Sequence, residues 1–161
     1  MIADPEAVEL AHAAGVGARV TLTVGGNVDR LHGDPITIAG LVIHTSDGSW
    51  IHEGPENAGV PVHHGPRAVI DVGGNLVVLE RVKTAPGDLQ QLRAVGIEPA
   101  NQHILVVKAA VRWRGGYLPI TKHHIDVDTI GLGSVNLDAF DFRQIRRPSF
   151  PLDEEASWDQ A

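Results

Sequence analysis

The sequence predicts a single α/β domain of mixed α+β type, with a mixed β-sheet of about six or seven strands that includes a hairpin, and two or three helices packed against the sheet. Short runs of valine, isoleucine and leucine recur along the chain, separated by glycine and proline turns. Two other stretches carry the start and stop signals of helices. A chain of 161 residues, 43% of them hydrophobic, can bury roughly 70% of its unfolded surface in one core.

Composition argues against several classes of protein. The formal net charge is −7, and no basic stripe with interleaved aromatic residues offers a surface for nucleic acid. No apolar run approaches the roughly 20 residues that span a bilayer, and the acidic N-terminus lacks the pattern of a signal peptide. Without cysteine the chain can form neither disulfides nor thiolate zinc sites. We therefore expect a cytoplasmic protein with no nucleic-acid or membrane partner.

The first two elements have clear local signals. Asp4 can cap a helix, Pro5 is tolerated in a first helical turn, and Gly15 suits the position after the last turn. These signals predict a helix over residues 5–14. Residues 18–24 then alternate apolar and polar side chains, which is typical of a half-buried strand.

The middle of the chain is rich in strand-forming residues. ITIAGLVIHTS, residues 36–46, predicts a long strand with Gly40 at a bulge or bend, followed by a hairpin-type turn at Asp47-Gly48. RAVIDV and LVVLERV flank Gly73-Gly74-Asn75 and predict a β-hairpin over residues 67–82.

The most informative stretch is ILVVKAAVRWRGGYLPI, residues 104–120. Its first four residues predict a buried strand, and a helix over residues 89–95, capped by Asp88, would connect this strand to the preceding hairpin as a right-handed unit with parallel strands. Ligands gather at the carboxyl ends of strands in such sheets. Three cations follow the strand and are the leading candidates for a binding site: Lys108, Arg112 and Arg114.

The C-terminal third is less regular. We expect a short helix over residues 117–122, and then a strand in HHIDVD with Ile125 and Val127 facing inward. A glycine-containing loop with Ser134 follows. The last residues are acidic and without pattern, so we place the domain at residues 1–152 and expect residues 153–161 to be a disordered tail.

Histidines and carboxylates gather between residues 52 and 64, which raises the question of a metal site: His52, Glu53, Glu56, His63 and His64. Adjacent histidines point apart on an extended chain, and HEGPE lacks the helical spacing of HExxH. We therefore assign no metal ligand to this chain. An independent hydrolase using His32 or His124 is a weaker hypothesis, because neither a cysteine nor a GxSxG motif supplies a nucleophile.

Four blocks together resemble the C-terminal domain of the microcystinase C (MlrC) family: DPEAVELAHAAGVGARVTLTVGG, ILVVKAAVRWRGGYLPI, VDTIGLGS and RRPSFPLD. They follow the order of the family and span nearly the whole chain. The resemblance implies a zinc-dependent metallopeptidase or amidohydrolase, the best known of which opens linearised microcystin peptides. In that family the zinc ligands and the catalytic acid–base group lie in a larger N-terminal domain, which we expect this chain to lack.

The resemblance implies a non-catalytic role for this chain. It would pack on the metal-bearing N-terminal domain and form one wall of the cleft for a peptide or amide substrate. Lys108, Arg112 and Arg114 would hold substrate carboxylates or carbonyl oxygens, and Ser134 would offer a neutral hydrogen bond. Zinc would belong to the partner domain and no cofactor to this chain. A homo-oligomer is the other partner that we consider.

Some residues depart from the family pattern and keep alternatives open. Ala109 stands where the family is expected to have serine, Arg112 where it is expected to have histidine, and TIGLGS replaces a proline-containing TPGLTS. The three cations could also form internal salt bridges with Asp126 or Asp128. The alternative function is a stand-alone or truncated binding or assembly module without catalytic activity.

Overall fold

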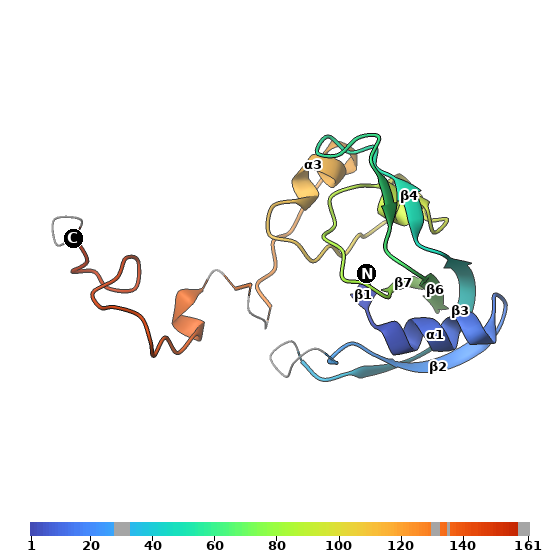
Figure 1. Ribbon diagram of the computed structural model, residues 1–161, viewed down its shortest axis with the longest axis horizontal. Helices are drawn as coiled ribbons and strands as arrows, with labels where there is room; N and C mark the ends of the chain where they lie inside the picture. The colour runs from blue at the N-terminus through green and yellow to red at the C-terminus, as the bar shows by residue number, and fades with distance from the viewer. Residues whose placement is uncertain (28–32, 130–132, 135, 158–161) are drawn as a thin grey trace. The chain divides into compact units, whose positions relative to one another are not determined.

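The structure is a computed structural model that describes residues 1–27, 33–129, 133–134 and 136–157. The chain divides into two compact units, residues 1–125 and residues 126–161. The larger unit contains all the strands of the described chain (Figure 1). Each unit is described by itself.

The strands form two sheets. Their bounds are β1 (Ile2–Ala3), β2 (Arg19–Val24), β3 (Ile36–Ser46), β4 (Ser49–Ile51), β5 (Pro61–His63), β6 (Arg67–Val72) and β7 (Asn75–Glu80). Five of them form a sheet in the order β1-β7-β6-β3-β2, in which β1 runs parallel to β7 and the other neighbours are antiparallel. The remaining two, β4 and β5, pair antiparallel in a small separate sheet. This arrangement confirms the predicted mixed α+β fold and its hairpin, β6–β7.

Helix α1 (Pro5–Ala14) packs on one face of the large sheet, as Figure 1 shows beside β2. The Asp4 carboxylate, 1% exposed, accepts hydrogen bonds from the Ala7 N–H at 3.1 Å, the Gly25 N–H at 3.1 Å and the Asn27 side-chain amide at 2.7 Å. The predicted helix and its cap are confirmed. Below the helix lies a buried apolar cluster: Ala7, Val8, Ala11, Leu22, Val24, Val42, Ala68, Ile70 and Leu79.

A second core lies on the other side of the central strands. It is built with helix α2 (Gln90–Arg93), helix α3 (Trp113–Tyr117) and the chain near them. Side chains alternate between the two faces of a strand, so Val69 joins this core while its neighbours Ala68 and Ile70 join the core under α1. The members of the second core are Val69, Val78, Leu92, Val95, Ile97, Trp113 and Tyr117.

A buried arginine connects the second core to the small sheet. Arg67, 1% exposed, donates a hydrogen bond to the Gln91 carbonyl, and its guanidinium lies 5.3 Å from the centre of the Trp50 ring. Glu80, 4% exposed, is the nearby anion, with 3.7 Å between its Oε2 and the Arg67 Nη2. The pair is therefore a desolvated ion pair at the base of the hairpin.

The largest error of the sequence interpretation concerns residues 104–107, which form no strand. Ile104 and Val106 are 83% and 88% exposed, and the only parallel pair among the described strands is β1–β7 rather than a β–helix–β unit. HHIDVD forms no strand either, and its Ile125 and Val127 are 87% and 72% exposed instead of facing inward. A strand needs a neighbour for its backbone groups, and the described chain supplies none to these segments.

Two smaller expectations in the middle of the chain were also wrong. Asp47-Gly48 does not close a hairpin, because β3 pairs with β2 and β6 while β4 pairs with β5. The bulge in β3 lies between Val42 and His44 rather than at Gly40, where the other expectation, a bend, stays a prediction. Gly40 instead permits a close approach of strands, since a Cβ there would lie 2.5 Å from the Asp71 carbonyl oxygen.

Short 3-10 turns complete the described structure: η1 (Pro99–Asn101), η2 (Leu118–Ile120) and η3 (Leu137–Ala139). Together, α3 and η2 place helical turns where a helix over residues 117–122 was predicted. The tail predicted from residue 153 begins at an ion pair between Asp153 and Arg147, and its boundary stays a prediction. No helix of the described ranges has the length and apolarity needed to cross a bilayer.

Candidate functional site

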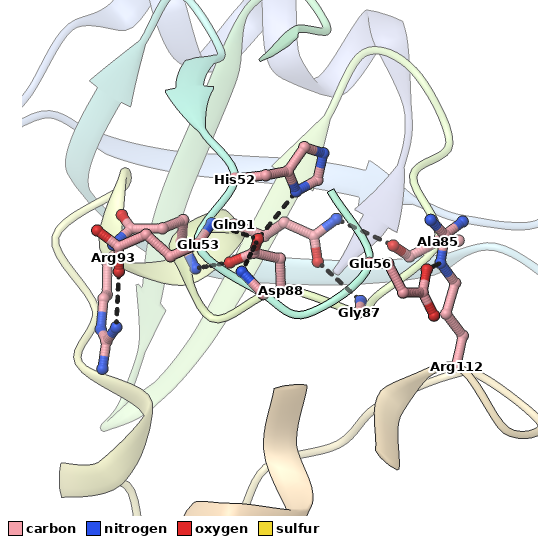
Figure 2. Close-up of polar contacts among 11 residues, drawn as sticks. His52, Glu53, Glu56, Ala85, Gly87, Asp88, Gln91, Arg93 and Arg112 are labelled. Carbon is pink, nitrogen blue, oxygen red and sulfur yellow. Dashed lines mark hydrogen bonds and ion pairs between the residues drawn. The ribbon is translucent and has the colours of Figure 1, made fainter. Parts of the chain in front are cut away.

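The buried carboxylate of Asp88 forms hydrogen bonds that hold two loops and the start of α2 together. The Asp88 Oδ2 accepts hydrogen bonds from the His52 Nδ1 at 2.9 Å and from the backbone N–H groups of Glu53 and Gly54, both at 2.8 Å. Its Oδ1 accepts from the Gln90 N–H at 2.8 Å. Figure 2 shows these contacts converging on Asp88, which is 3% exposed. The helix predicted over residues 89–95 is shorter, and its N-cap residue is Leu89, which makes no side-chain cap bond. Asp88, the predicted cap, lies one residue earlier and binds both the Gln90 N–H and the loop that follows β4.

Electrostatics keep this carboxylate charged. Burial alone would raise the pKa of Asp88, but the hydrogen bonds from the Gly54 and Gln90 N–H groups, the His52 ring and the Glu53 N–H outweigh burial and lower it. The His52–Asp88 pair is also short enough for an ion pair if the ring is protonated. The carboxylate can thus orient the His52 ring and fix its tautomer.

The loop before Asp88 is held just as firmly. Gln91 is a buried residue, 1% exposed. Its side-chain amide donates a hydrogen bond to the Ala85 carbonyl at 3.0 Å and accepts one from the Gly87 N–H at 3.3 Å. Gly116 of α3 lies against the same loop, since a Cβ there would be 2.5 Å from the Gly87 carbonyl oxygen. Glycine at position 116 is therefore needed for α3 to approach this loop.

A polar hollow opens between these groups. Arg112, at the start of α3, donates from its Nε to the Glu56 carboxylate at 2.8 Å (Figure 2), and the two side chains are 46% and 54% exposed. His52, Asp88, Glu56 and Arg112 all line the hollow. It therefore combines an oriented histidine, two carboxylates and a guanidinium within a small volume open to solvent.

The four predicted site residues do not lie together in one site. Arg112 lines the hollow, and Arg114 lies 5.9 Å from the centre of the Trp113 ring, on the same short helix. Lys108 is exposed, and no ion pair holds it to the described part of the chain. Ser134 belongs to the smaller unit, where its hydroxyl donates to the Asp128 carboxylate at 3.1 Å. The structure thus places two of the four residues at α3, with Arg112 as its N-cap residue and Arg114 within it.

The alternative of internal salt bridges with Asp126 or Asp128 does not describe Arg112, whose partner is Glu56. The site also contains a pair that sequence reasoning missed, His52 and Asp88. Both were singled out, one in the histidine-rich stretch and one as a cap, but they are 36 positions apart in the sequence, and no local signal indicates that they meet.

The described residues offer no zinc site of their own. Nowhere in the described ranges do three or more histidine, aspartate or glutamate side chains gather in a geometry that could hold a metal ion. His63 bonds the Ser49 hydroxyl at 2.7 Å and His64 bonds the Thr84 hydroxyl at 3.0 Å. The Nδ1 atom of each of these two rings is therefore engaged with a hydroxyl group, and only His52 in this stretch pairs with a carboxylate.

The chain is similar to one protein family and to two proteins named below. A family described as MlrC C-terminus matches residues 1–144. Microcystinase C of Sphingomonas sp. is 26% identical over 150 residues, which are 93% of this chain and 28% of that protein. A crystal structure of a "Putative metallopeptidase" from Mesorhizobium sp. BNC1 superposes with a TM-score of 0.81 at 30% identity, over 96% of this chain and 31% of that one.

These matches confirm the resemblance that the sequence blocks indicated, and the superposition supports the mixed α+β fold. The chain spans about three tenths of the length of either relative. Because the family match covers most of the 161 residues, the chain belongs to the MlrC C-terminus family.

Proposed function

We propose that this chain is the C-terminal, non-catalytic domain of a microcystinase-like metallopeptidase or amidohydrolase. It packs on a metal-bearing N-terminal domain and forms part of the cleft for a peptide or amide substrate. One observation carries this proposal: nearly all of the chain matches a C-terminal family, whereas it spans only 28% of microcystinase C and 31% of the Mesorhizobium protein.

The proposed division of labour agrees with the chemistry of the described residues. A catalytic zinc needs three protein ligands and an open position, and the described residues assemble no such group. In this proposal zinc belongs to the N-terminal domain, as the resemblance to the family implies. When bound there, it would supply an activated water and polarise the scissile carbonyl.

The contribution of this chain would be positive charge at the cleft. Lys108 is exposed and can meet a carboxylate as a point charge, while Arg114 presents a planar fork suited to a carboxylate or a carbonyl oxygen. Arg112 already holds Glu56, but this pair is half exposed, so exchanging Glu56 for a substrate carboxylate costs little. Ser134 would add a neutral hydrogen bond.

Reconstitution tests the proposal. The N-terminal part of the Mesorhizobium protein, without the portion that matches this chain, is mixed with this chain, and bound zinc and peptide hydrolysis are measured for each component and for the mixture. We expect zinc in the N-terminal part, none in this chain alone, and hydrolysis that depends on both. The same N-terminal part with its own C-terminal portion is the positive control.

Two variants then test the site residues. Lys108→Ala and Arg114→Ala should raise KM for a peptide with a carboxylate more than they lower kcat, because they remove binding of the ground state and transition state alike. Arg81→Ala, which removes a surface arginine paired with Glu9, is the matched control. Stoichiometric zinc and hydrolysis by this chain alone would refute the proposal, and binding without hydrolysis would favour the assembly-module alternative.

A further inference from the structure

Two segments have the sequence of strands but not the pairing. Residues 104–107, ILVV, are β-branched or aliphatic throughout, and residues 123–128, HHIDVD, alternate polar and apolar side chains. Neither segment belongs to a helix or a strand of the described structure. The aliphatic side chains of Ile104, Val106, Ile125 and Val127 are between 72% and 88% exposed, the four highest values among the large apolar residues of the described chain apart from Phe150.

The first segment already has the two-sided arrangement of a strand. Leu105 and Val107 are partly buried against the second core, whereas Ile104 and Val106, between and before them, face solvent. Side chains of a strand point alternately to opposite faces, so one face of this segment is packed and the other is empty. What it lacks, among the residues that the structure describes, is a neighbouring strand.

The backbone of these segments has almost no partners in the described part of the chain. Within the described residues, the backbone of 104–108 makes one main-chain hydrogen bond, from the Ala109 N–H to the Val107 carbonyl, and that of 123–128 makes none. By contrast, each residue of β6 is in register with a partner in β7. Unpaired N–H and C=O groups beside exposed apolar side chains form an open template for another strand.

The length of the relatives indicates what completes these segments. The Mesorhizobium chain has the same fold over 96% of this one at a TM-score of 0.81, yet more than two thirds of it lies outside the match. The matched family is described as a C-terminus, which favours a remainder that precedes the matched portion. A second copy of this chain is a poorer occupant, because each copy carries a net charge of −7.

We propose that residues 104–107 and 123–128 become β-strands by pairing with strands of the N-terminal metallopeptidase domain. This inference rests on the proposed function and adds the mode of docking. Such pairing would cover the exposed side chains of Ile104 and Val106, so that both faces of the ILVV segment are packed. It would also place Lys108, the residue directly after the first segment, at the junction of the two domains, where a substrate carboxylate could reach it.

Hydrogen exchange read by mass spectrometry tests this directly. In the isolated chain, the amides of 104–107 and 123–128 should exchange nearly unprotected, while those of β6 and β7 are slow. Addition of the N-terminal part of the Mesorhizobium protein should slow both segments by about 100-fold or more, as expected for new sheet pairing. Fast exchange in the complex would overturn the inference.

A backbone variant separates strand pairing from simple apolar contact. Val106→Pro removes an N–H that bonds nothing in the isolated chain and introduces a residue that the interior of a paired strand excludes, so it should weaken the complex by about tenfold or more and leave the melting of the isolated chain unchanged. Val106→Ala keeps the N–H and is the matched control, with a smaller loss. Equal losses in the two variants would contradict strand pairing.

The outcomes also distinguish this inference from the proposed function. A mixture that hydrolyses peptide while both segments stay unprotected keeps the function and refutes the docking mode. Absence of any complex, when the relative's own C-terminal portion does bind, refutes both. Protection that depends on the concentration of this chain alone would show pairing between copies and would also overturn the inference.

Discussion

Replacing Asp88 by alanine tests whether the polar centre of the candidate site also stabilises the fold. The change removes the acceptor of three backbone N–H groups and of the His52 ring. A buried donor left unpaired costs about 1–3 kcal/mol, and water in the adjacent hollow can replace some of these bonds, so we expect a loss of about 3 kcal/mol. For a chain of this length that corresponds to a fall in Tm of about 6–12 °C.

The loss should depend on pH in a defined direction. The pKa of Asp88 is lowered in the folded state, so its charge stabilises the fold fully above the unfolded-state value of about 4 and less as the pH falls through the folded pKa. Urea unfolding followed by circular dichroism at pH 7 and pH 3 measures this. The difference between wild type and Asp88→Ala should shrink at pH 3.

Asp126→Ala is the matched control, because Asp126 is exposed and accepts no hydrogen bond from another described residue. It should leave stability unchanged. A loss below about 1 kcal/mol for Asp88→Ala would mean that solvent replaces all four hydrogen bonds. A large loss that is the same at both pH values would refute the assignment of the effect to the carboxylate charge.

Three further substitutions test other features. Gly40→Ala should cost about 1–3 kcal/mol by forcing β3 away from the Asp71 carbonyl, and an unchanged Tm would contradict that close approach. Arg67→Met should lower the free energy of unfolding by about 3–5 kcal/mol, because it leaves Glu80 buried without its cation. Adding Glu80→Gln should recover part of this loss in a double-mutant cycle. If the effects of the two substitutions simply add, the result would argue against an interaction between Arg67 and Glu80. Arg112→Ala should cost no more than about 1 kcal/mol in urea unfolding, because its ion pair is half exposed, and a larger loss would indicate a structural role for Arg112.

Elements with signals inside their own sequence could be predicted well. The helix over residues 5–14 has its cap, its proline and its terminal glycine within a dozen residues, and the structure has the same bounds. The long strand over residues 36–46 and the hairpin around Gly73-Gly74 are likewise where the alternation and turn residues indicated. In these cases the local preference and the tertiary environment agree.

Elements whose state depends on a distant neighbour could not be predicted. Residues 104–107 have the composition of a buried strand, but composition does not say whether a neighbouring strand is present, and the described residues supply none. The meeting of His52 with Asp88 depends on how two loops fold across 36 residues. The cationic residues could be singled out by charge alone, whereas the pairing of Arg112 with Glu56 required the three-dimensional arrangement.

The contacts of Asp4 bear on how this domain can be trimmed for laboratory work. One carboxylate holds the first turn of α1 and, through Gly25 and Asn27, the end of β2. A version shortened to begin at Pro5 would keep the whole sequence of β2 but would lose the hydrogen bonds from Gly25 and Asn27 that hold the end of this strand to the start of α1. The smallest piece worth expressing includes Asp4, and tags belong before Met1 or at the exposed Gly73-Gly74 turn.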